Sequence, residues 1–179
     1  MKSIKKLLFI DTNPGVVQAW VRHLADIDNV DIRCDSIVNA DCDAVVSPAN
    51  SYGIMDGGVD LVLRDWLGGY VETELKYRIR ELPDKKLPVG EVLIIERDFS
   101  SCPILISAPT MEIPSDVSKT QNAFKAMLAV LRATNNRSDI KSIAITGLCT
   151  LTGMMDYDKS AIQIRQAIFA NYLQQKNVR

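Results

Sequence analysis

The sequence has few of the residues that build metal centres and histidine-dependent catalytic sites. Its 179 residues include one histidine, His23, and four cysteines, Cys34, Cys42, Cys102 and Cys149, none of them in a Cys-x-x-Cys pair. His23 lies outside the apolar face of its predicted helix, so we expect it at a solvated edge and predict no metal site. The isolated cysteines are expected to be reduced thiols in a cytoplasmic protein.

Concentrated charge, aromatic residues and long apolar runs are also scarce. The 21 Lys and Arg residues balance 22 Asp and Glu residues and are spread along the chain, and aromatic residues make up 6%. A nucleic-acid surface needs clustered basic charge and stacking side chains, so these values argue against nucleic acid as a partner. The apolar run at residues 7–10 ends at Asp11 and is too short for a signal peptide or a membrane span, so no membrane partner is expected.

Short apolar runs alternate with amphipathic segments along the whole chain. Strands are predicted at residues 7–10, 30–34, 44–46, 92–95, 104–106 and 143–145, and helices at residues 14–24, 59–66, 71–82, 124–131 and 161–172. Helical spacing places Val21, Val62 and Tyr172 on apolar faces. Continuously apolar strands between amphipathic helices indicate an α/β protein with a mostly parallel sheet covered on both faces, in a single domain of residues 1–179.

Polar or glycine-containing segments follow four of the predicted strands, at residues 11–13, 47–58, 108–111 and 147–153. Ligands of such sheets bind beyond the carboxyl ends of the strands, so we expect these segments to converge on one cleft. The second segment joins a strand to a helix through a polar loop and the pair Gly57-Gly58. This arrangement is typical of loops that present backbone N–H groups to a phosphate.

Four short motifs in the same order resemble those of macrodomains, the modules that bind ADP-ribose. They read Asp-Thr-Asn-Pro from Asp11, Ser-Pro-Ala-Asn-Ser from Ser47, Met-Asp-Gly-Gly from Met55 and Ala-Pro-Thr-Met from Ala108. Over nearly its whole length the chain is most similar to the bacterial and phage tail-assembly-like macrodomain subfamily. The resemblance implies a three-layer α/β/α fold with a central mixed, mostly parallel sheet, and it implies no cofactor.

The resemblance assigns the catalytic roles to Asn50 and Asp60. Asn50 matches the asparagine that holds the distal ribose, and its amide can both donate and accept hydrogen bonds. The alternative is an asparagine that only shapes its own turn. Asp60 matches an aspartate that activates water at the anomeric carbon of the distal ribose in some hydrolytic macrodomains. The alternative is a carboxylate favoured by the dipole at the start of a helix.

Further residues are expected to contact the ligand. Asp35-Ser36-Ile37 resembles the Gly-Asp-Ile of the family, whose aspartate binds the adenine amino group. Counting back from Asn50 without gaps puts Ser36 at the aspartate position, so both Asp35 and Ser36 are candidates. Tyr52 either covers the ribose or packs on the loop. The other ligand contacts predicted on this side are Ile37, Ala49, Gly57, Gly58 and Val59.

The loop at residues 147–153 is expected to cradle the pyrophosphate through its backbone N–H groups. Its predicted contacts are Gly147, Leu148, Cys149, Thr150, Leu151, Thr152 and Gly153. The subfamily usually has glycine where this chain has Cys149 and Leu151. A side chain at a left-handed position costs about 1 kcal/mol or more, and its bulk is expected to weaken binding or turnover. Cys149 is interpreted as a small apolar filler.

The predicted function is binding of ADP-ribose or a derivative, with an ADP-ribosylated protein as a further candidate partner. Hydrolysis of ADP-ribosyl conjugates or of ADP-ribose 1''-phosphate is left open. The alternative is a degenerate, non-catalytic macrodomain that acts through a protein contact or in phage-related assembly, which the substitutions at Cys149 and Leu151 favour. A third hypothesis is another nucleotide or RNA in the same cleft.

Overall fold

The described strands form one sheet in the computed structural model, which describes residues 5–96 and 103–177. The strands are β1 (Lys6–Asp11), β2 (Val30–Cys34), β3 (Ala44–Ser47), β4 (Leu93–Ile95), β5 (Ile104–Ser107) and β6 (Ser142–Ile145). Their order is β2-β1-β6-β3-β5-β4, and every neighbouring pair is parallel except β4 with β5. This confirms the predicted mixed, mostly parallel sheet.

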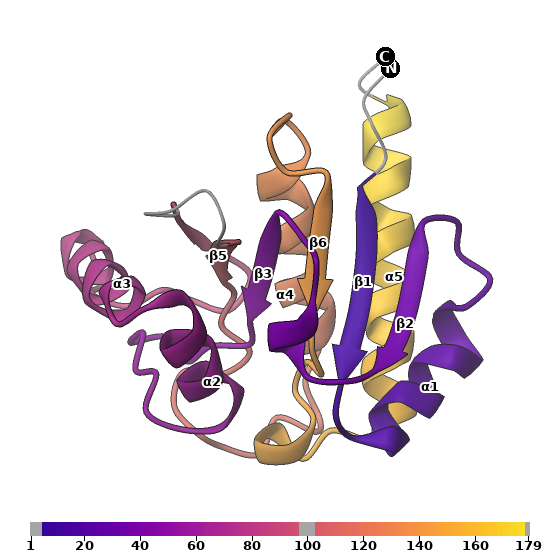
Figure 1. Ribbon diagram of the computed structural model, residues 1–179, viewed down its shortest axis with the longest axis horizontal. Helices are drawn as coiled ribbons and strands as arrows, with labels where there is room; N and C mark the ends of the chain where they lie inside the picture. The colour runs from indigo at the N-terminus through magenta and orange to yellow at the C-terminus, as the bar shows by residue number, and fades with distance from the viewer. Residues whose placement is uncertain (1–4, 97–102, 178–179) are drawn as a thin grey trace.

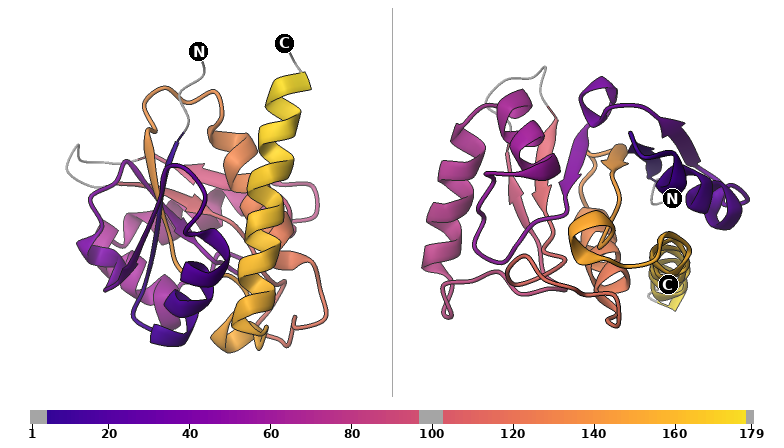
Figure 2. Two further views of the ribbon diagram at one scale, coloured as in Figure 1. Left: turned by 90° about the vertical axis from the view of Figure 1, so that its right-hand side faces the viewer. Right: turned by 90° about the horizontal axis from the view of Figure 1, so that it is seen from below.

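Helices cover both faces of the sheet (Figures 1 and 2). α2 (Gly58–Leu67) and α3 (Tyr70–Glu81) pack on one face, and α1 (Pro14–Leu24), α4 (Asn122–Thr134) and α5 (Tyr157–Asn177) pack on the other. Because side chains alternate along a strand, each strand feeds both cores. In β1, Leu7 and Phe9 enter the core beneath α1, α4 and α5, whereas Leu8 and Ile10 enter the core beneath α2 and α3. The three-layer α/β/α architecture is confirmed.

Three side chains that the helical spacing assigns to apolar faces are exposed. The exposed fraction is 53% for Val21, 42% for Val62 and 47% for Tyr172. Spacing gives the direction of an apolar face, but the packed neighbours decide how wide the buried part is. Val62 borders the cleft described below, and Val21 follows the buried Trp20 by one residue, a turn of about 100° around the helix axis.

The structure places three of the four cysteines and the single histidine. Cys34, Cys42 and Cys149 are free thiols, and Cys102 lies outside the described residues. His23 is partly exposed, as predicted, and its Nε2 lies 2.8 Å from Asp158 Oδ1. Among the described residues, no helix combines the length and apolar character needed to cross a bilayer.

The central strands β3 and β6 share a short ladder. Their paired residues are Ala44 with Ile143 and Val45 with Ala144, although β3 continues to Ser47. Beyond this point β3 pairs only with β5, as far as Ser47, and β6 pairs only with β1, at Ile145. The carboxyl edge of the sheet is therefore free to open between β3 and β6.

Candidate functional site

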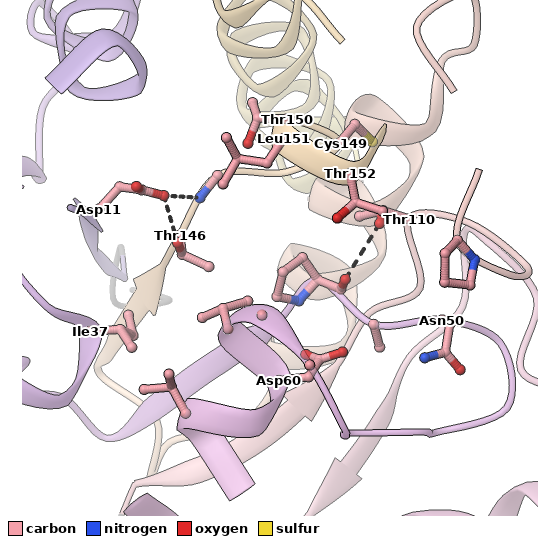
Figure 3. A pocket seen from close by; sticks show the side chains of 18 of the residues that line it. Asp11, Ile37, Asn50, Asp60, Thr110, Thr146, Cys149, Thr150, Leu151 and Thr152 are labelled. Carbon is pink, nitrogen blue, oxygen red and sulfur yellow. Dashed lines mark hydrogen bonds between the residues drawn. The ribbon is translucent and has the colours of Figure 1, made fainter. Parts of the chain in front are cut away.

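A cleft of about 570 Å³ lies at the carboxyl edge of the sheet, within the size range of small-molecule sites. Its walls include Asp11 at the end of β1 with Thr12 after it, residues 48–50 and 56–60 after β3, Thr110 and Met111 after β5, and residues 146, 147 and 149–152 after β6. Figure 3 shows Asp60 and the loop at residues 149–152 on opposite sides of it. The four segments predicted to converge do so.

The N-terminus of α2 forms one wall of the cleft. Gly57 precedes the helix, and no side chain of the described residues caps its first N–H groups. Gly58 has φ +57°, and a Cβ added at either glycine would meet no atom within 4 Å. The backbone therefore faces the cleft without covering side chains. Free N–H groups and the positive end of the helix dipole favour an anion at this position.

Asp60 lies in the first turn of α2 and is 9% exposed. The Ser47 hydroxyl donates a hydrogen bond of 2.6 Å to Asp60 Oδ1. Burial raises the pKa of the Asp60 carboxyl from 3.8 to about 6; the Ser47 bond opposes this rise, and the carboxylates of Asp56 and Glu72 add to it. A buried carboxylate that lines a cleft and titrates near neutral pH is suited to proton transfer as well as to hydrogen bonding.

Ser47 and Ser107 are register partners on β3 and β5, so both side chains face α2 and α3, yet only Ser47 has a bonding partner among the described residues. We expect Ser47→Ala to lower the free energy of unfolding by about 1.5 kcal/mol at pH 8, since it removes a bond to a buried charge. Ser107→Ala removes an unpartnered buried hydroxyl and is expected to be neutral or stabilising. Urea denaturation of both variants tests this, and equal losses would contradict it.

Asn50 lines the cleft, but most of the hydrogen-bonding capacity of its side-chain amide is taken up within its own loop. Nδ2 donates to the Ile54 carbonyl at 2.8 Å, and Oδ1 accepts from the N–H groups of Tyr52 (3.0 Å) and Ile54 (3.3 Å). The turn-shaping interpretation therefore holds for this structure. One N–H of the amide is left over, so a contact of Asn50 with a ribose stays a prediction, limited to donation.

The two candidates for the adenine contact differ in position. Ser36 and Ile37 line the cleft, and Asp35 is not among its lining residues. The Asp35 carboxylate instead accepts from Asn39 Nδ2 (2.8 Å) and from the Ser36 N–H (2.7 Å), and these bonds lower its pKa. The Asp35 carboxylate thereby holds together the two ends of the short 3-10 helix Ile37–Asn39, an element that the sequence pattern did not predict.

Tyr52 lies outside the cleft, and its hydroxyl donates to Glu112 Oε1 at 3.0 Å. The packing interpretation of Tyr52 is therefore the one the structure supports. Leu148 and Gly153 also fall outside the lining. Leu148 is fully buried in the core beneath α1, α4 and α5, and a Cβ at Gly153 would come within 2.8 Å of Val117. Both residues fix the path of the loop from inside.

The opposite wall holds the loop at residues 149–152. Cys149 and Leu151 have φ values of +62° and +37°, which confirms the predicted left-handed positions. Cys149 is 2% exposed, and burial raises the pKa of its thiol to about 12, so it is an inert filler. Leu151 is 66% exposed and lies at the rim. Within the described residues, the N–H groups of Leu151 and Thr152 have no bonding partner and are available to a ligand.

Asp11 holds the start of this loop in place. Its Oδ2 accepts from the Thr146 hydroxyl (2.7 Å) and from the Gly147 N–H (3.0 Å), and its Oδ1 accepts from the Asn13 N–H (2.8 Å), as Figure 3 shows in part. The Gly147 N–H is therefore occupied. A Cβ at Gly147 would come within 2.4 Å of Thr150 Oγ1, so this glycine is required for close packing.

Several lining residues were not predicted individually. Asp11, Thr110 and Met111 belong to segments that the motifs had marked, so a signal existed for them. Asp56 stands inside the Met-Asp-Gly-Gly motif. Ile54 lies in the segment 47–58 that was expected at the cleft, and Val62 was assigned to an apolar helix face and not to a site. Pro114 and Thr146 carry no pattern that separates them from ordinary surface.

Comparison with known proteins places this geometry in a family. Residues 46–164 match the model of the Macro domain family. An uncharacterized protein of Aquifex aeolicus is 34% identical over 118 residues, which cover 66% of this chain and 67% of that protein. An uncharacterized protein of Aeropyrum pernix is 38% identical over 106 residues, covering 59% of this chain and 52% of that protein. The chain thus spans about two thirds of the first relative and about half of the second.

Solved structures share the fold at low sequence identity. The macrodomain of Mycobacterium tuberculosis DarG has a TM-score of 0.64 at 18% identity, over 79% of this chain and 88% of that one. A mutant Oceanobacillus iheyensis macrodomain with ADPR has a TM-score of 0.64 at 19% identity, over 76% and 74%. A Trypanosoma brucei macrodomain in complex with ADP-ribose has a TM-score of 0.55 at 15% identity, over 92% and 58%. The matched family model covers more than half of the sequence, and the chain therefore belongs to the Macro domain family.

Proposed function

We propose that this protein binds ADP-ribose or an ADP-ribose derivative in the cleft. The observation that carries the proposal is the bare N-terminus of α2, where Gly58 at φ +57° leaves the backbone open to an anion. Family membership supports it, since related macrodomains have been solved with ADP-ribose or ADP bound. As part of the same proposal the chain acts as a single cytoplasmic domain of the tail-assembly-like subfamily.

In the proposed arrangement the ligand crosses the cleft between its two walls. The adenine lies near Ser36 and Ile37, and the pyrophosphate lies between the N-terminus of α2 and the N–H groups of Leu151 and Thr152. The distal ribose then lies toward Asn50 and Asp60. This order uses the free backbone donors for the charged part of the ligand, where hydrogen bonds are strongest.

Hydrolysis of a group on the distal ribose is proposed as the activity of this site, with Asp60 as the base that accepts a proton from water. At pH 7 and above, a carboxyl with a pKa of about 6 is mostly ionised and can take up that proton. Ser47 holds one oxygen of Asp60 and thereby orients the other. An ADP-ribosylated protein is the proposed substrate class.

Calorimetric titration with ADP-ribose tests the binding proposal. We expect saturable binding at micromolar ligand, and no heat up to high micromolar ligand would reject it. Loss of label from an ADP-ribosylated protein tests the activity separately. We expect Asp60→Ala to abolish release with little change in affinity, and Asn50→Ala to weaken binding through loss of loop geometry and of one donor. Unchanged release by Asp60→Ala would remove Asp60 from the mechanism.

A non-catalytic module that contacts another protein is the second candidate. The left-handed positions of Cys149 and Leu151 favour it, because side chains replace glycine beside the proposed pyrophosphate path. A co-purified partner, together with a cleft that gives no heat with ADP-ribose, AMP or NAD, would support this candidate over the first.

A further inference from the structure

The charge of the cleft is one-sided. Three carboxylates line it, those of Asp11, Asp56 and Asp60, and none of its described lining residues is Lys, Arg or His. The Asp11 carboxylate is held by three donors of the chain. The two carboxylates beside the α2 N-terminus have less compensation. Asp60 has one neutral donor, Ser47, and no hydrogen bond or ion pair of Asp56 is found among the described residues.

Neighbouring cations do not offset this charge. Arg64 on α2 and Lys76 on α3 both pair with Glu72, at 3.4 Å and 2.6 Å, and Arg64 also pairs with Asp65 at 3.3 Å, so two cations face two carboxylates. Lys86, which is not among the lining residues, pairs with Glu112 at 3.1 Å. Cations already engaged in short ion pairs contribute little to the field in the cleft, so the end of the cleft near Asp56 and Asp60 carries net negative charge.

We propose that the cleft selects ADP-ribosyl ligands whose distal ribose carries an uncharged group and discriminates against a phosphate at that position. The inference rests on the proposed function and names the substrate class of the same site. The pyrophosphate is tolerated because backbone N–H groups from α2 and from the loop at residues 149–152 contact it directly. A terminal phosphate would add up to two negative charges facing Asp56 and Asp60, where the described lining offers no cation.

The apolar rim of the cleft also favours an uncharged group on the distal ribose. Ile54, whose carbonyl accepts a hydrogen bond from Asn50 Nδ2, lines the cleft beside Asn50 at 42% exposure. Its side chain offers a group attached to the distal ribose apolar contact and no charge. A neutral or apolar substituent therefore keeps its contacts with the rim, whereas a phosphate loses water and gains only repulsion.

Paired titrations of ADP-ribose and ADP-ribose 1''-phosphate at pH 8 and low salt test the inference. We expect the phosphorylated ligand to bind about tenfold more weakly or worse, the scale of Coulomb repulsion between partly exposed charges at short range. Asp56→Asn is expected to narrow this ratio by about threefold. Asp28→Asn is the matched control, because it removes the same charge from an exposed position just before β2, at the opposite edge of the sheet, and the ratio should not change.

Repeating the paired titrations at lower pH tests the inference independently of the Asp56→Asn variant. Toward pH 5.5 the terminal phosphate falls from two negative charges toward one and Asp60, which faces Asp56, Glu72 and the Ser47 hydroxyl, gains a proton, so the ratio of the two affinities should narrow. Equal affinity of both ligands at pH 8, or a ratio unaffected by Asp56→Asn, would overturn the selectivity and leave ADP-ribose binding standing. Absence of binding by ADP-ribose itself would reject the proposed function and this inference together.

Discussion

Gly58→Val is expected to weaken ADP-ribose binding by about 100-fold or more. Gly58 has φ +57° at the first position of α2, and its missing Cβ leaves the helix N-terminus open to the cleft. A valine side chain at this position would stand where the pyrophosphate is proposed to lie. It would displace at least two hydrogen bonds to a charged group, each contributing about 1.5 kcal/mol or more, which together exceed a factor of about 100.

Backbone strain must be separated from steric blockage in this experiment. Gly90→Val supplies the control, since Gly90 also has positive φ (+99°) and its nearest neighbour to an added Cβ is Lys125 at 3.8 Å. Both variants should lose about 1–2 kcal/mol of stability from the left-handed backbone. We expect only Gly58→Val to lose binding. Calorimetry that finds wild-type affinity in Gly58→Val would show that the ligand does not approach α2.

Asp60→Asn is expected to stabilise the protein at pH 8 by about 1–3 kcal/mol. The folded state binds a proton at Asp60 up to pH about 6, whereas the unfolded chain releases it near 3.8. Between these values the folded state holds more protons, so the contribution of Asp60 to stability falls as pH rises through the window. Above pH about 6 the ionised Asp60 carboxylate lowers the free energy of unfolding by its full amount, about 3 kcal/mol for a pKa difference of roughly two units. Asparagine carries no charge, and its Oδ1 can still accept from Ser47.

The signature of this effect is its pH dependence. The advantage of Asp60→Asn over wild type should be near zero at pH 4 and largest at pH 8, measured as the free energy of urea unfolding at each pH. Asp28→Asn removes an exposed carboxylate and should show no such trend. An advantage of Asp60→Asn that is the same at both pH values would mean that Asp60 is not protonated near neutral pH in the folded state. If Asp60→Asn binds ADP-ribose with wild-type affinity but no longer releases label from an ADP-ribosylated protein, the loss reports on catalysis alone.

The fold was open to prediction because its signals are local. The predicted start of α1 at residue 14 is confirmed: Pro14 is its first residue, and Asn13 caps it, with Oδ1 accepting from the Gly15 N–H at 2.8 Å. Continuously apolar strands specified burial on both faces. The predicted end of the α2 helix was correct to one residue, since Gly68, with φ +106°, follows Leu67. The short 3-10 helices at Ile37–Asn39 and Leu151–Gly153 were not predicted, because three residues carry no periodicity.

The site was predicted at the level of segments rather than atoms. The position of these segments after parallel strands predicted that the α2 N-terminus and the loop at residues 149–152 meet at one cleft. The glycines that the resembling subfamily has in place of Cys149 and Leu151 predicted the left-handed backbone of these two residues. The bond from Ser47 to Asp60 joins residues 13 apart across a strand end and a helix, and only the path of the loop between them decides it. For the same reason, the use of the Asn50 amide by its own loop could not be known in advance.

The short ladder between β3 and β6 has a consequence for how occupancy can be detected. Hydrogen bonding between these central strands stops at Val45 and Ala144, and the two cleft walls are attached beyond that point. A molecule that bonds both walls acts as a cross-brace between the two halves of the sheet. Because the ligand binds only the folded state, it raises the free energy of unfolding by about 2.7 kcal/mol at a ligand concentration of roughly 100 times Kd. The melting temperature of this chain should therefore serve as a direct gauge of what the cleft holds.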